Sequence, residues 1–125
     1  MADAPDTDGA GPSSRPPAAG SRAGDAYLVL PEGGPGPGVL VLHSWWGLTP
    51  FFEALCDRLA AEGFAALAPD LFGGETADDA ASADALQRRL SRTRRVPAYR
   101  QLEAAIARLL SQRGVEQDHL AVIGF

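Results

Sequence analysis

The chain has 125 residues, a formal net charge of −5 and an isoelectric point near 4.8. This length suits one domain of ordinary size. Nucleic-acid binders usually carry a basic excess, so an acidic chain is not expected to bind nucleic acid. No apolar run approaches the ~20 residues of a membrane span, so we expect no membrane association. A single cysteine excludes an intrachain disulfide and a multi-cysteine metal site, and we expect no metal or other cofactor.

Residues 1–24 differ in composition from the rest of the chain, because Ala, Gly, Pro and Ser dominate and Met1 is their only large apolar side chain. Such a segment cannot bury enough apolar surface to offset the entropy lost on ordering. We therefore predict a disordered, dispensable tail over 1–24 and a folded domain over 25–125. Because the tail lacks the apolar stretch of a secretory signal, we expect a cytoplasmic protein.

Short apolar runs in the folded part are predicted to be strands, separated by turn-forming or helical segments. Two of these runs, 39–43 and 64–68, show no alternation with polar residues, which is typical of strands buried on both faces of a parallel sheet. The Gly- and Pro-rich segment 31–38 is predicted to be a loop. The remaining predicted strands are 26–30 and 119–123.

Three helices are predicted between these strands. The first begins with Thr49 as N-cap and Pro50 at the first helical position, carries Cys56 on its apolar stripe and ends before Gly63. The others cover 78–95 and a segment that opens at Pro97. Strands that alternate with helices indicate an α/β fold with a parallel sheet. We expect Cys56 to be buried as a small hydrophobe rather than to act as a nucleophile.

In an open α/β sheet, ligands bind outside the carboxyl ends of the strands. Three of the predicted strands, together with the segments that follow them, carry the motifs VLVLHSWWGL, GFAALAPDLFGG and AVIGF. The motif LEAAIARL precedes the last of them. In this order they resemble the first half of a dienelactone hydrolase, a branch of the α/β-hydrolase superfamily, over Tyr27–Phe125. The resemblance implies the N-terminal half of that parallel sheet, with 39–43 between 64–68 and 119–123, and with 26–30 beyond 64–68.

In this family, the strand that resembles AVIGF leads into a nucleophile elbow, Gly-x-Cys/Ser-x-Gly-Gly. The resemblance implies that Gly124 and Phe125 are the first two residues of that elbow. We therefore expect the sequence to stop before the nucleophile and the catalytic Asp and His, and the chain to be inactive alone. It also implies that the backbone N–H of Trp45 is an oxyanion-hole donor.

The other candidate site residues are His43, Ser44, Trp46 and Arg89. His43, Ser44 and Trp46 follow a buried strand and are predicted to line the substrate pocket, although His43 could equally be a structural histidine. Ser44 stands where better-known dienelactone hydrolases have a Glu, so a Cys or a Ser nucleophile both stay open. Arg89 belongs to a basic cluster that is either a solvated helix end or the source of a ligand for a substrate carboxylate.

Two functions from different classes follow from these residues. The first is a hydrolase that cleaves a small ester or lactone through an acyl-enzyme, as the resemblance implies. The second is a non-catalytic half-domain that pairs with a partner chain. We also expect self-association through 119–123, because an apolar edge strand with unpaired backbone groups can pair with other chains.

Overall fold

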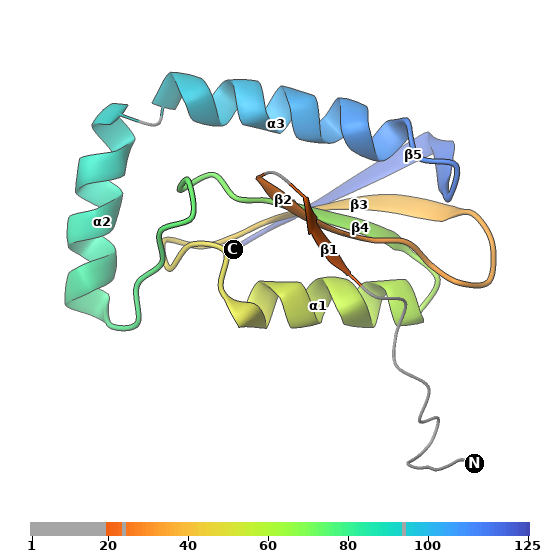
Figure 1. Ribbon diagram of the computed structural model, residues 1–125, viewed down its shortest axis with the longest axis horizontal. Coiled ribbons are helices and arrows are strands. Elements are labelled where there is room, and N and C mark those ends of the chain that lie inside the picture. Colours follow the sequence, from red (N-terminus) through yellow and green to blue (C-terminus); the bar gives the residue numbers. More distant parts are fainter. Residues whose placement is uncertain (1–19, 24, 94) are drawn as a thin grey trace, which may run out of the picture.

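The computed structural model describes residues 20–23, 25–93 and 95–125 (Figure 1). The chain forms strands and helices in the order β1, β2, β3, α1, β4, α2, α3, β5. The strands are β1 (Ser21–Ala23), β2 (Ala26–Val29), β3 (Gly36–Leu42), β4 (Ala65–Pro69) and β5 (Val115–Gly124). The helices are α1 (Pro50–Ala61), α2 (Ala80–Thr93) and α3 (Arg95–Leu110).

The strands form one mixed sheet in the order β1-β2-β4-β3-β5. The neighbours of β3, which are β4 and β5, run parallel to it, as predicted. The expected order of the four apolar strands is also confirmed. The α/β fold is confirmed, and the sheet is mixed because β2 runs antiparallel to β4. The link between β2 and β3 is too short for a crossover helix, so the chain reverses direction there.

The helices cover both faces of the sheet, with α1 on one side and α3 on the other, while α2 stands beyond one end of the strands (Figure 1). Every residue of β4 is buried. Ala66 and Ala68 belong to the core beneath α1, and Ala65 and Leu67 belong to the core beneath α3. Strand β4 therefore faces a hydrophobic core on each side, which is why it reads as a continuous apolar run.

Several predicted boundaries shift by a few residues. β3 begins at Gly36, inside the predicted loop 31–38, because Gly36 pairs with Val115 at the start of β5. β5 is accordingly longer than the apolar run 119–123. Helix α2 begins at Ala80 instead of Asp78, since the Asp79 carboxylate accepts a hydrogen bond from the Ser82 backbone N–H at 2.7 Å.

The predicted ends of α1 are confirmed in position. Pro50 is its first residue, but Thr49 caps it only through its backbone carbonyl, which accepts the Phe52 N–H at 3.0 Å. Gly63 follows the helix with φ +99°, the left-handed conformation in which glycine carries no steric penalty. The described helices include none that is both long and apolar enough to cross a membrane.

Part of the predicted tail is ordered. Residues 21–23 form β1, which pairs antiparallel with β2. The rest of the predicted disordered tail, residues 1–19 and 24, lies outside the described residues. The prediction fails at 21–23 because composition does not reveal the contacts of Arg22. Its guanidinium binds Glu53 at 2.7 Å, Asp70 at 3.1 Å and the Leu48 carbonyl at 3.0 Å.

The bonds of Arg22 predict that deletion of the whole segment 1–24 is not neutral. Arg22→Ala should lower the free energy of unfolding by about 2 kcal/mol, the scale of a few hydrogen bonds to charged groups of which one is buried. Urea unfolding of the variant measures this loss. Deletion of 1–19 is the matched control and should change stability by less than ~0.5 kcal/mol. An Arg22→Ala variant with the same free energy of unfolding as the unmodified chain would show that β1 does not anchor the sheet.

Strand β5 is an edge of the described sheet, since it pairs only with β3. Ala121 and Val122 are exposed on it, Val122 with 56% of its surface accessible. We propose that this edge makes the chain self-associate. Val122→Lys should shift sedimentation toward the monomer, because a charge penalises edge pairing. Val122→Thr, which keeps β-branching without charge, should not. A monodisperse monomer of the unmodified chain would contradict the prediction.

Candidate active site

The loop that follows β3 is held as a tight turn. The Ser44 carbonyl accepts the Gly47 N–H at 3.0 Å, and the Ser44 hydroxyl accepts the Trp46 N–H at 3.3 Å. Gly47 has φ +89°, and a Cβ atom there would collide with the Glu75 carbonyl oxygen. Only glycine therefore fits where this turn meets the loop that follows β4.

The backbone N–H of Trp45 differs from its neighbours in this turn. It makes no hydrogen bond to any residue that the structure describes, whereas the N–H groups of Trp46 and Gly47 are both bonded. The indole of Trp45 is 41% exposed and contacts the Trp46 ring edge-on. The N–H of Trp45 is therefore an unused donor on a loop whose geometry is fixed by its neighbours.

A cavity of about 490 Å³ lies beside this turn. The register of β5 against β3 pairs Gly124 with Leu42, so Phe125 stands next to the start of the loop. The Phe125 ring packs against the Phe52 ring at a centroid distance of 5.2 Å. The cavity is lined by Ser44, Trp46, Thr49, Phe51, Phe52, Ala77, Asp78 and Phe125. Two of the predicted pocket residues, Ser44 and Trp46, are thus brought together here.

His43 is buried and does not line this cavity. Its Nε2 accepts the Leu71 N–H at 3.0 Å, so the proton lies on Nδ1, which donates to the Ser44 carbonyl at 2.7 Å. Both ring nitrogens are therefore used, and the ring also packs edge-on against Phe72. Burial lowers the pKa of His43 below its usual range. The geometry favours the structural interpretation, in which His43 joins the loops after β3 and β4.

Asp70, directly after β4, is the other buried polar side chain at this end of the described sheet, with 2% of its surface exposed. One carboxylate oxygen accepts the Phe72 N–H at 3.1 Å and the other accepts a hydrogen bond from Arg22. Gln101 on α3 donates to the Asp70 carbonyl at 3.0 Å. Asp70 thus holds the backbone of the loop after β4, and its charge is paired with Arg22.

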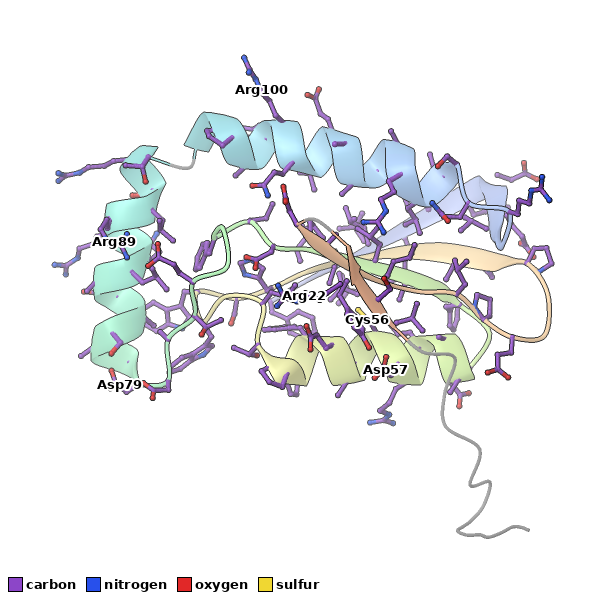
Figure 2. The ribbon with its side chains drawn as sticks, viewed as in Figure 1. Arg22, Cys56, Asp57, Asp79, Arg89 and Arg100 are labelled. Carbon is purple, nitrogen blue, oxygen red and sulfur yellow. The ribbon has the colours of Figure 1, made fainter. Side chains whose placement is uncertain are left out.

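Arg89 lies on α2 and points to the loop after β4 rather than into the cavity (Figure 2). It forms a two-pronged ion pair with Glu75, at 2.6 and 3.1 Å. These hydrogen bonds lower the pKa of Glu75. Its neighbour Arg88 pairs with Asp84. In this arrangement Arg89 secures the loop and leaves the cavity without its positive charge.

Cys56 is fully buried on the inner side of α1 (Figure 2). Burial raises the pKa of its thiol to about 12, so it is not a thiolate at neutral pH. The prediction that Cys56 is buried is confirmed. Among the described residues, no group of three or more His, Cys, Asp and Glu side chains is placed to hold a metal ion.

The sequence profile of the dienelactone hydrolase family matches residues 25–125. The chain belongs to the dienelactone hydrolase family. A protein of Aquifex aeolicus is 34% identical over 102 residues, which are 79% of this chain and 44% of that protein. A carboxymethylenebutenolidase of a Pseudomonas strain is 45% identical over 53 residues, 42% of this chain and 22% of the relative.

A solved structure shows the same resemblance. It is a dienelactone hydrolase-like promiscuous phosphotriesterase from metagenomic libraries, 35% identical, with a TM-score of 0.64 over 80% of this chain and 42% of that one. The chain thus spans less than half the length of these relatives. The α/β-hydrolase fold of the family is shown for the part that the chain shares with them.

Most of the cavity wall of this family member was not predicted. The sequence carries no signal that places Phe51, Ala77 or Asp78 at a pocket, and Phe125 is marked only by its place in the motif AVIGF. The sequence around Thr49 indicates only a helix cap. The aromatic run around Phe51 and Phe52 at the start of α1 was the one pattern that could have indicated an apolar pocket.

The hydrogen bonds of His43 predict a pH-dependent stability. Its neutral form is stabilised in the folded state, so its contribution is complete above the ordinary pKa of 6.5 and is lost as the pH falls through the lower folded-state value. Urea unfolding at pH 7.5 and 5.5 should show a larger loss for the unmodified chain than for His43→Gln. His119→Gln, at an exposed histidine, is the control and should keep the loss. Equal losses in all three chains would contradict this role.

Proposed function

We propose that this chain supplies an oxyanion donor and an apolar pocket to a dienelactone hydrolase-family enzyme that cleaves a small ester or lactone through an acyl-enzyme. The observation that supports this most directly is the unused N–H of Trp45, on a fixed turn after the central strand β3. No Gly-x-Cys/Ser-x-Gly sequence occurs within the 125 residues. The nucleophile and its acid and base would therefore have to come from residues outside them.

In such a reaction the nucleophile adds to the ester carbonyl, and the carbonyl oxygen becomes an oxyanion. A backbone N–H that is already fixed in place stabilises this charge without reorganisation. In elbow-type hydrolases a second donor is the N–H that follows the nucleophile. Collapse of the intermediate expels the alkoxide, which takes a proton from the acid, and water then hydrolyses the acyl-enzyme by the same path. The turn hydrogen bonds of Ser44 would hold the Trp45 donor throughout.

The finer assignments belong to the same proposal. Carboxylesterase activity is the form of ester cleavage that this donor and an apolar cavity would support. We also propose a cytoplasmic location, which is the location expected from the sequence. The exposed β5 edge favours a second candidate, a non-catalytic half-domain that assembles with a partner chain. Co-expression with the remaining part of a relative would distinguish the two, since assembly without hydrolysis fits only the second.

A chimera tests the hydrolase. Residues 1–125 are joined to the part of the Aquifex aeolicus protein that follows its matching segment, and hydrolysis of 4-nitrophenyl acetate is measured. The chain alone should show no hydrolysis, because the catalytic triad acts as a unit. In the chimera, Trp45→Pro removes the N–H and should lower kcat by about 10²- to 10³-fold.

Trp45→Ala is the matched control, since it removes the indole and keeps the N–H. It should retain most of the activity, and circular dichroism of both variants checks that the loop change leaves the fold intact. Equal rates for a folded Trp45→Pro variant and for Trp45→Ala would exclude the proposed oxyanion role.

A further inference from the structure

The cavity beside the Ser44–Gly47 turn is lined mainly by aromatic and uncharged groups. Four aromatic side chains, those of Trp46, Phe51, Phe52 and Phe125, contribute to its wall. Aromatic walls favour apolar ligands, which bury area against the ring faces and edges. Ser44 and Thr49 add two hydroxyl groups, and neither carries charge. The wall can therefore bind an uncharged group well.

The charged groups near the cavity are unsuited to an anion. Asp78 has the one charged side chain among the described lining residues, and it is acidic. Two like charges at close range repel each other, so Asp78 disfavours a bound carboxylate. No basic residue is among the described residues that line the cavity.

The predicted carboxylate ligand, Arg89, is engaged elsewhere. Its guanidinium fork is matched to both oxygens of Glu75, at 2.6 and 3.1 Å. A two-pronged bond of this kind is the arrangement with which arginine would bind a substrate carboxylate. To serve the cavity, Arg89 would have to leave Glu75 and approach a wall that carries Asp78.

On the proposed function, we infer that this cavity takes the acyl part of an uncharged, apolar ester or lactone and discriminates against substrates that carry a carboxylate. Ser44 is consistent with this selectivity because it adds a small neutral group at the cavity wall. The discriminating residue is Asp78, and Arg89 takes no part in ligand binding.

A matched pair of probes tests the inference on the chain itself. Phenylacetamide and phenylacetate have nearly the same shape, but only the second is an anion. Tryptophan fluorescence, to which Trp46 in the wall contributes, reports their binding. Phenylacetamide should bind about tenfold more tightly than phenylacetate at low salt. Equal or tighter binding of phenylacetate, or no saturable binding of either probe, would overturn the inference.

Three variants assign the selectivity to its cause. Asp78→Asn should bring the two affinities to within about threefold, because it removes the repelling charge and keeps the size of the side chain. Glu62→Gln removes the same charge from an exposed position just after α1 and should leave the tenfold ratio unchanged. Arg89→Ala should leave phenylacetate binding unchanged. An unaltered ratio in Asp78→Asn, or weaker phenylacetate binding in Arg89→Ala, would refute the assigned roles.

These measurements involve no hydrolysis, so they separate this inference from the hydrolase proposal. An inactive chimera with neutral-selective binding would remove the acyl-group assignment and leave the selectivity of the cavity in place. An active chimera whose cavity prefers phenylacetate would support the hydrolase proposal and refute the inferred selectivity for uncharged ligands.

Discussion

The burial of β4 on both faces is the constraint on which the rest of this structure depends. A strand whose every side chain meets a core needs a covering layer on each side, and α1 and α3 supply these layers. The parallel direction of β3, β4 and β5 brings their carboxyl ends to the same end of the sheet. The backbone ladder stops there, and the loops that follow offer unpaired polar groups and space for a ligand.

Two buried polar side chains hold the loops at this end of the sheet in place. His43 connects the loop after β3 to the loop after β4 by accepting the Leu71 N–H, and Asp70 binds the Phe72 N–H on the next residue of the second loop. Burying a carboxylate is costly unless it is paired and hydrogen-bonded, and Arg22 of β1 provides the pairing charge. The short strand β1 thus contributes to the site indirectly, since it stabilises the residue that holds a loop.

The sequence predicted the parts of the fold that burial alone determines. Strands β3 and β4 are recognisable because apolar residues on both faces leave an unbroken apolar run, and Gly63 because only glycine readily takes its backbone conformation. It did not reveal β1, whose order comes from the ion pairs of Arg22 with residues far along the chain. Nor did it reveal the first half of β5, where Val115 and the charged Glu116 pair with β3 before the register shifts and pairing resumes at Leu120.

The candidate site was predictable to a similar degree. The rule that ligands bind beyond the carboxyl ends of strands pointed to Ser44, Trp45 and Trp46, which lie in the loop after β3, because this rule depends only on sheet direction. It could not separate His43, whose ring is consumed by hydrogen bonds, from residues that face the cavity. The partner of Arg89, which is Glu75, could not be predicted either. Glu75 lies fourteen residues earlier, across a loop whose path the local sequence does not determine.

Within the loop after β3, backbone and side chains are suited to different tasks. The turn is fixed by the Ser44 carbonyl and by Gly47, so the direction of the Trp45 N–H depends little on which side chains stand around it. Ser44 and Trp46 line the cavity, and the indole of Trp46 makes no hydrogen bond within the described turn. A change of side chain at Trp46 can therefore alter the ligand while the donor stays in place. On the proposed function, one loop framework can thus keep the Trp45 donor fixed while the side chains around it determine which ligand the cavity accepts.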